Sequence, residues 1–494
     1  MLRTMYIDEN ACKRWDTAVL AFWERVLERD TPKLGSLTAL RIFLPRSMGG
    51  LGVQSAEIRR SAAYIGAFEG SFSAIAEALG FDSAGQFVER CPKLHATLTK
   101  AGEKLQSDMG APYKWAPEDC LATPMRKRQH EHVEKVYQHI RAHVAAHLSI
   151  EDRADFYSTG GKTAGDFLGA SPVVGDEFVM PDKHLQCALR RRLGLLSPGW
   201  CRALRHGSST STQCNHQFPS GKVCGCALDQ YGRHAGQCKV GGLILRWHDE
   251  LRDWLMHWIA ETTQRPVSWK PEPYVPAWNY TVNRKNPATK RREPVVVEAR
   301  LDGHFTEHSG RPAYTDVCIP AAYSEVPATL HDRAKTPGLA AEQAVQGKHN
   351  KYPDDKNPTA SLWAFAIESL GRPSEEALQL LRQLAPTDPS ERAHALKVAH
   401  YRMSTIIAMR QAELLMAAEG PSVYGRAPPK FKPKALWRPE LGAGPLAGPP
   451  LRISLSRERA EDSDGEYVDE TLSSLNPGKG PPGWAEQWRR PQIQ

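Results

Sequence analysis

The sequence has no long apolar run and is poor in cysteine. No stretch of about 18 consecutive apolar residues occurs, and residues 1–15 contain no apolar signal core, so we expect neither a membrane-spanning helix nor an export signal. Ten cysteines among 494 residues are too dilute for a secreted disulfide scaffold. A strong excess of one charge is also absent. The 64 Lys and Arg exceed the 56 Asp and Glu by +8, which is compatible with a polyanionic partner but does not demand one.

The length and composition of the chain predict several globular domains. Hydrophobic residues make up 41% of the chain and charged residues 24%, which is a globular composition, and the length exceeds that of one ordinary core. Apolar residues recur at helical spacing, so we predict a mainly helical region over residues 1–205. Its last predicted helix, 182–195, carries Arg190, Arg191 and Arg192, which we expect to form a solvated face rather than a nucleic-acid contact. The other helices are predicted at 18–26, 56–78 and 130–147.

Four of the ten cysteines crowd into residues 207–242, where no apolar periodicity survives. Such a segment buries too little apolar surface to order itself, so we predict a metal-stabilised knuckle. Thiolate and imidazole suit tetrahedral Zn²⁺, and a closed set of four ligands is structural. His216 is a spare ligand, and free thiols in a loop are the alternative. The candidate ligands are Cys214, either Cys224 or Cys226, His234 and Cys238.

Two aspartates interrupt apolar runs that alternate like strands. Asp302 lies in the run 295–305 and Asp316 in the run 313–319. Gly310 lies between the runs, so we predict a hairpin that places both carboxylates on neighbouring strands. A buried carboxylate is costly unless it is paired or metal-bound. Mg²⁺ prefers oxygen ligands of this kind, so a catalytic magnesium site is the expectation.

A lysine pair follows the two aspartates. Lys348 and Lys351 lie in a predicted helix over 338–352, where an ammonium group could stabilise charge that develops on a phosphate. By spacing alone, the favoured interpretation is two ordinary hairpin aspartates followed by exposed lysines.

The remaining segments complete an α+β fold with several domains. An amphipathic helix is predicted at 243–262, and two helices are predicted within residues 371–419. Residues 420–494 are rich in Pro and Gly and then acidic, which predicts a disordered tail. The other predicted elements are strands at 272–275 and 361–367 and helices at 375–384 and 390–418.

Several short motifs occur in an order that resembles one known family. Across roughly 150 residues, their order and spacing resemble the zinc knuckle and the restriction-enzyme-like endonuclease of non-LTR retrotransposon proteins. The motifs are Asp229-Gln230-Tyr231-Gly232-Arg233-His234-Ala235-Gly236-Gln237-Cys238, Arg246-Trp247-His248-Asp249, Arg300-Leu301-Asp302, Asp316-Val317-Cys318-Ile319 and Lys348-His349-Asn350-Lys351-Tyr352.

This resemblance implies a fold and a reaction. The fold is one helix, three strands, a second helix and a fourth strand over residues 243–370, and the reaction is hydrolysis of a DNA phosphodiester. The implied zinc set contains Cys224 rather than Cys226, so Cys226 is only the alternate ligand. The implied site residues are Asp302 and Asp316 on Mg²⁺, Lys348 or Lys351 as the active-site cation, His248 and Glu250 as supporting groups, and Cys214, Cys224, His234 and Cys238 on structural Zn²⁺.

Three positions depart from the family pattern. Leu301 stands where proline is usual, Cys318 occupies the place where restriction enzymes usually carry lysine, and Trp247 splits the Arg-His pair. The active-site lysine must therefore come from the following helix, and the role of His248 is the least certain of the set.

The amino-terminal half also resembles such element proteins. The stretch 44–52, Leu-Pro-Arg-Ser-Met-Gly-Gly-Leu-Gly, resembles the segment that follows their polymerase palm, and 191–195 resembles the segment before their knuckle. The chain therefore looks like the carboxyl-terminal piece of an element protein. We expect it to lack a Tyr/Phe-x-Asp-Asp polymerase motif and to have no polymerase activity.

The expected partners are target DNA and, less directly, element RNA, with action in the nucleus and the oligomeric state left open. Arg246, Lys290, Arg291 and Arg292 are the candidate DNA contacts. The basic run that ends at Arg292 is equally well explained as a nuclear localisation patch or a solvated loop. Two alternatives to the enzyme remain: a remnant that binds nucleic acid without cutting, and a zinc-stabilised protein-interaction module.

Overall fold

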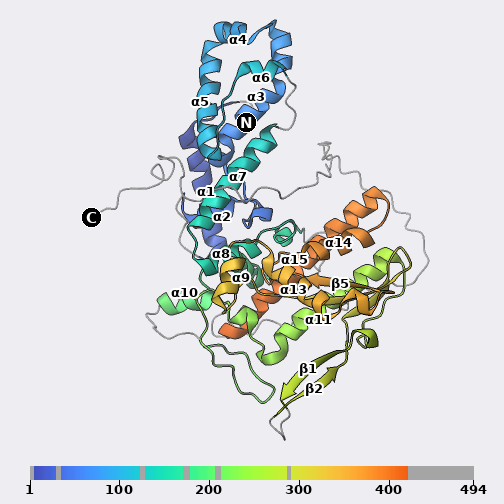
Figure 1. Cartoon of the computed structure of the whole chain (residues 1–494). Coiled ribbons are helices and arrows are strands. Elements are labelled where there is room, and N and C mark those ends of the chain that lie inside the picture. Colours follow the sequence, from blue (N-terminus) through green and yellow to red (C-terminus); the bar gives the residue numbers. More distant parts are fainter. Residues whose placement is uncertain are drawn as a thin grey trace, which may run out of the picture.

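The fold is α+β and mostly helical, and a small sheet lies in the carboxyl half (Figure 1). The computed structural model describes residues 5–28, 35–122, 128–170, 178–205, 213–285 and 291–420. The predicted tail, 420–494, and Lys290 therefore lie outside the described residues, apart from Gly420. No helix in the described part of the chain is long and apolar enough to cross a membrane.

The amino-terminal part is an elongated bundle whose long helices pack side by side (Figure 1). Its predicted helices at 18–26, 56–78 and 130–147 are confirmed, because the first two fall within α1 and α3 and the third exceeds α7 by one residue only. Phe72, Phe87 and Leu98 are fully buried at its core. The helices are α1 (Glu9–Leu27), α2 (Leu37–Phe43), α3 (Ala56–Leu79), α4 (Ala84–Arg90), α5 (Pro92–Met109), α6 (Pro117–Ala122), α7 (Arg128–Ala146) and α8 (Ile150–Ser158).

The arginines of α9 (Asp182–Arg192) are buried, so the expectation of a solvated face is wrong. Arg190 donates to Leu27 O and Leu196 O, and Arg191 pairs with Asp155 Oδ2 at 3.1 Å. Arg192 donates to three backbone carbonyls, those of Gly50, Ala164 and Arg46. The guanidinium groups thus satisfy loop carbonyls that helices and strands leave unpaired, a task for which their fixed fork of donors is suited.

The sheet in the carboxyl half has the order β3-β4-β5, with β3 antiparallel and β5 parallel to β4. One face packs on α11 (Leu243–Thr263), where Phe305 and Val317 meet Trp254 and Leu255. On the other face Ala364 packs against the helix α13. The elements of these layers are β3 (Gly303–Thr306), β4 (Pro312–Cys318), β5 (Ser361–Ala366), α12 (Pro327–Arg333) and α13 (Leu339–Lys351).

The first two predicted strands differ from the structure. The run 295–305 divides, because Ala299 and Leu301 are buried in a separate cluster with Trp278 and the chain leaves one sheet before entering the next. Residues 272–275 form no strand and contribute only a bridge from Tyr274 to Arg300. A separate hairpin, β1 (Tyr280–Lys285) with β2 (Arg292–Val297), projects from the body instead (Figure 1).

Two helices close the described chain and were predicted almost to the residue. They are α14 (Glu375–Leu384) and the 31-residue α15 (Pro389–Glu419). The helix α15 packs on α9, α11 and α14, and also on η4 (Ala235–Gln237) of the cysteine-rich segment. It therefore joins the helical half, the cysteine-rich segment and the sheet.

Replacing Gly50 should destabilise the helical half. A Cβ atom there would lie 2.1 Å from Leu44 O and 2.5 Å from Arg41 O, both of them backbone atoms that move only with the chain. We expect Gly50→Ala to lower the free energy of unfolding by about 3 kcal/mol or more, measured by urea unfolding. The control is Gly347→Ala in α13, where a Cβ meets nothing within 4 Å. It should stabilise by up to about 1 kcal/mol through helix propensity. Equal stability of Gly50→Ala and wild type would contradict the close packing.

Candidate active site and metal centre

The pairing of β3 with β4 places Asp302 and Asp316 opposite each other. Gly303 pairs with Thr315, so the register extended by one residue sets Asp302 across from Asp316. Residues directly opposite on an antiparallel pair project to the same side with Cβ atoms about 5 Å apart. Both carboxylates are buried, and they interact directly with each other. The predicted convergence of the two side chains is therefore present in the structure.

Asp302 is the member of the pair that is held ionised. Its Oδ2 accepts from Val317 N at 2.7 Å and lies 3.1 Å from His248 Nε2 on α11. Burial raises the pKa of Asp302, but the hydrogen bond and charge of His248 outweigh it and lower the pKa. Burial likewise lowers the pKa of His248, and Asp302 with Asp249 more than offsets this and raises it to about 9. An imidazolium–carboxylate pair results.

Asp316 is the member of the pair whose ionised form is disfavoured. Burial first, and then the charge of Asp302, raise the pKa of Asp316 to about 6 despite the opposing effect of Lys348. Lys348 Nζ on α13 lies 2.7 Å from Asp316 Oδ2. A hard divalent cation between the two carboxylates would relieve their mutual repulsion, and carboxylate oxygens are the ligands that such ions prefer.

Several predicted residues lie away from this group. Lys351 rests its ammonium on the rings of Tyr280 and Tyr352 instead. Glu250 pairs with Arg410 of α15, so the structure does not bring it to the aspartates. The sequence does not show which of the two lysines reaches the aspartates. In the structure Lys348 lies on the side of α13 that faces Asp316 of β4, and Lys351 does not.

The predicted DNA contacts are divided between two places. Arg246 is exposed near the start of α11, and Arg291 and Arg292 are exposed at the start of β2, at the end of the projecting hairpin that lies farthest from the Tyr280–Val297 pair. The paired strand β1 carries Arg284 and Lys285, the other basic residues of the segment 284–292 that is expected to contact DNA, and both are exposed.

The second group is a cluster of three cysteines and one histidine. The ligand atoms of Cys214, Cys224, His234 and Cys238 all lie within 4.8 Å of one another, and they form the only such group of three or more in the part of the chain that the structure describes. Cys226 is exposed and is not one of these four residues, so the geometry favours Cys224 over Cys226 as the fourth member of the group.

Two short structures bring the four side chains together. Bridges Gln213–Ala227 and Gln217–Val223 form a hairpin that carries Cys214 and Cys224. The turn of η4 separates His234 from Cys238. The turn is held by Asp229, which accepts from Tyr231 N at 3.0 Å and His234 N at 2.8 Å. Asp229 is a positioning residue that the sequence analysis missed, although an aspartate before a turn is a recognisable signal.

His216 is not part of the cluster. It is buried, and its Nε2 lies 3.0 Å from Leu414 O of α15. His216, which the sequence analysis gave as an additional zinc ligand, therefore attaches the cysteine-rich segment to α15 instead. Cys214 and Cys238 are also buried against this helix, near Ala412 and Leu415.

The expectation about the polymerase motif needs a correction. Tyr352-Pro353-Asp354-Asp355 does match the Tyr-x-Asp-Asp pattern. In the structure Tyr352 caps α13, and both aspartates lie exposed in the turn η7 (Asp354–Lys356). Exposed carboxylates in one such turn do not converge from neighbouring elements as a metal site of a polymerase requires.

Comparison with known families finds no family model that matches this chain, and comparison with curated proteins finds no match. The likeness to retrotransposon proteins therefore stays a prediction.

Replacing Asp316 by its neutral isostere should stabilise the metal-free protein. Because the pKa of Asp316 in the folded chain is about 6, above its ordinary value, ionisation at neutral pH opposes folding. We expect Asp316→Asn to raise the free energy of unfolding by about 1 to 2 kcal/mol at pH 7.5 in chelator. The gain should shrink as the pH falls below 6, where wild-type Asp316 is protonated.

The matched control is Asp302→Asn. Its wild-type pKa is lowered, so its charge contributes stability and the amide should unfold more easily. If both amides shift the unfolding midpoint in the same direction, the assignment of one favoured and one disfavoured carboxylate is wrong.

Proposed function

We propose that this protein is a metal-dependent DNA endonuclease of the kind found in non-LTR retrotransposons, and that it nicks target DNA to prime reverse transcription by a separate polymerase. One observation supports this above the others: Asp302 and Asp316 meet from adjacent strands, with Lys348 2.7 Å from Asp316. In metal-dependent hydrolysis of a phosphodiester, carboxylates hold a divalent cation next to the scissile phosphate, and a nearby ammonium group can stabilise the charge that develops there.

Each residue of this group has its own role in the proposed hydrolysis. Asp302 and Asp316 would hold Mg²⁺, which when bound supplies Lewis-acid stabilisation of the phosphate and activation of water. Lys348 stabilises the negative charge that develops on the phosphate and keeps its own proton, because burial is outweighed by Asp316 and its pKa is raised. His248 orients Asp302 through the 3.1 Å contact and is a positioning residue. Lys351 and Glu250 take no direct part.

The proposed DNA contacts are the exposed arginines. Arg246 lies on the same helix as His248, and the hairpin β1–β2 presents Arg284, Lys285, Arg291 and Arg292. A two-stranded ribbon with basic side chains fits the width of a major groove and neutralises phosphates. Chromosomal DNA as the target places the activity in the nucleus, with element RNA as a second ligand.

Zinc is the metal we propose for the cysteine cluster. Zn–S bonds of about 2.3 Å and Zn–N bonds of about 2.05 Å in a tetrahedron set S–S and S–N separations near 3.8 and 3.6 Å. Cys214 Sγ lies 3.8 Å from Cys238 Sγ, and Cys224 Sγ lies 3.6 Å from His234 Nε2. Four protein ligands leave no open position, so this zinc is structural.

Cutting should depend on Asp316 and Lys348. In a supercoiled-plasmid nicking assay with Mg²⁺, Asp316→Ala should lower the rate at least about a hundredfold and Lys348→Ala about ten- to a hundredfold. Lys351→Ala, which removes a lysine whose ammonium group contacts Tyr280 and Tyr352, should stay within about threefold of wild type.

The carboxylate control is Glu298→Gln, because Glu298 is exposed and paired with Arg300 away from the two aspartates. Nicking by the Asp316→Ala variant at the wild-type rate would rule the proposal out. Salt-dependent DNA binding by a wild-type protein that never nicks would favour the inactive remnant, and no DNA affinity at all would favour the protein-interaction module.

Metal content should separate two neighbouring cysteines. We expect one zinc per chain by native mass spectrometry, lost in Cys224→Ser and retained in Cys226→Ser, because only Cys224 lies in the cluster. Zinc affinity of Cys224→Ser should fall at least about tenfold. Retention of the metal by Cys224→Ser together with its loss from Cys226→Ser would reverse the ligand assignment.

A further inference from the structure

A cavity of about 380 Å³ lies in the amino-terminal bundle, far along the chain from both groups described above. Helices α1, α2, α3, α5 and α7 all contribute to its lining. Its apolar wall includes Leu40, Phe43, Ile58, Val136 and Ile140. This volume suits a small organic molecule with an apolar body.

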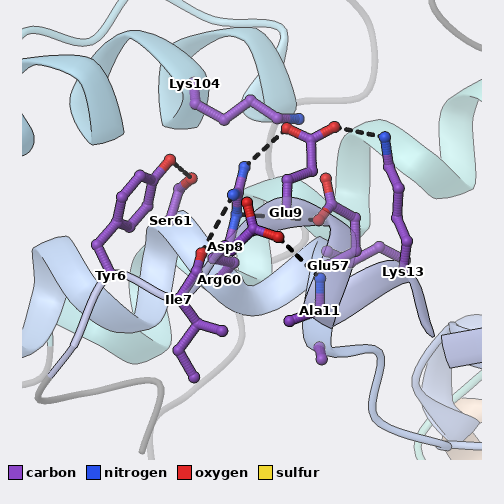
Figure 2. A network of polar contacts seen from close by, with 12 residues as sticks. Tyr6, Ile7, Asp8, Glu9, Ala11, Lys13, Glu57, Arg60, Ser61 and Lys104 are labelled. Atoms are coloured by element: carbon purple, nitrogen blue, oxygen red, sulfur yellow. Dashed lines mark hydrogen bonds and ion pairs between the residues drawn. The ribbon is translucent and has the colours of Figure 1, made fainter. Parts of the chain in front are cut away.

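One carboxylate in the lining has no adequate partner. Glu57 is only 5% exposed, and neither Oε1 nor Oε2 has a hydrogen-bond partner among the described residues. The nearest cation is Arg60, whose Nε lies 3.9 Å from Oε2. Figure 2 shows that Arg60 is directed elsewhere, to Glu9 and to the backbone carbonyl of Ile7.

The other acidic groups of the lining are accounted for, which isolates Glu57. Asp16 accepts from Ser55 Oγ, Ala56 N and Glu57 N, so it caps the start of α3. Asp108 pairs with Lys104 through Oδ1, and only its Oδ2 is left without a hydrogen bond.

The basic groups of the lining do not supply the missing donor, since neither the two lysines nor His143 and His147 form a hydrogen bond to Glu57. Lys13 pairs with Glu9, as Figure 2 shows, and Lys104 pairs with Asp108. A buried carboxylate without hydrogen bonds costs several kilocalories per mole, of order 1 to 3 even for a neutral group. The cavity therefore presents carboxyl oxygens without hydrogen-bond donors inside an apolar wall; burial raises the pKa of Glu57, and a cation bound beside it would favour its ionised form.

We propose that this cavity binds a compact organic cation, an amine or amidinium group on an apolar body, with Glu57 as its acceptor. The ligand's N–H groups would supply the donors that Glu57 lacks, and the free Oδ2 of Asp108 offers a second acceptor. A metal ion fits less well, because no group of three metal-ligating atoms occurs here among the described residues. The apolar wall would contact the body of the ligand, which a hydrated ion lacks.

Benzamidine and benzamide test the proposal, since they have the same shape and differ in charge. In isothermal titration of the full chain, benzamidine should bind at least about tenfold tighter than benzamide, because only the amidinium can form a charge-assisted pair. In Glu57→Gln the two ligands should bind within about threefold of each other. The control is Glu77→Gln on the exposed side of the same helix, which should keep the full preference.

The Glu57→Gln variant should keep its fold, because glutamine has the same shape and removes an unpaired buried charge. Far-UV circular dichroism and the thermal midpoint check this directly, and we expect an unchanged spectrum with an equal or higher midpoint. Benzamidine binding no tighter than benzamide to the wild type, or a preference that survives in Glu57→Gln, would overturn the proposal. Neither result bears on DNA cleavage, which depends on other residues.

Discussion

The packing of α15 is the constraint on which the remaining structure depends. Along one 31-residue helix, Ser404 accepts from Phe167 N at 3.0 Å, Arg410 pairs with Glu250, and the carbonyl of Leu414 meets His216. These contacts fix the helical half, α11 and the cysteine-rich hairpin to one rigid rod. Arg233 of the cysteine-rich segment also pairs directly with Asp152 and Asp155 of α8, so α15 and these ion pairs together position the helical half and the cysteine-rich segment.

Within the sheet, strand register decides the chemistry. Side chains alternate between the two faces of β4, with Val317 on the side of α11 and Asp316 on the side of α13. A slip of one residue would turn Asp316 toward the tryptophans of α11 and Val317 toward Lys348. The apolar side chains that anchor Val317 and Phe305 in the core therefore also hold the carboxylate pair in place, and packing and function select the same register.

The sequence predicts those parts of this arrangement that depend on local periodicity. The stripe of Trp247, Leu251 and Trp258 predicts α11 and its buried face, because helical spacing alone determines which side of a helix is apolar. The opposition of Asp302 and Asp316 is also predictable, since a hairpin joins them within a short stretch of chain. For the cluster, spacing supplies the candidates, and only the fold separates Cys224 from Cys226.

The features that escape sequence reasoning depend on partners distant in the chain. From the sequence, Arg192 is expected to belong to a solvated cationic face. In the fold, the loop that contains Gly50 covers it, and Arg192 donates to the carbonyl of Gly50. The split between β2 and β3 depends on Trp278, whose cluster draws Leu301 away from the first hairpin. No local pattern predicts the contact of Arg192 with the Gly50 loop or that of Leu301 with Trp278, because the tertiary fold alone brings these segments together.

Glu250, which the sequence analysis expects to support the two aspartates, has a different partner in the structure. It lies two residues after His248 on α11, and its charge pairs with Arg410 of α15. This pair holds α11 against α15, and the same helix α15 receives the cysteine hairpin through His216. A structural metal in that hairpin would thus stiffen the rod against which α11 is set. The packing of α11 on α15 also positions His248 beside Asp302, so α15 links the cysteine–histidine cluster to the carboxylate pair.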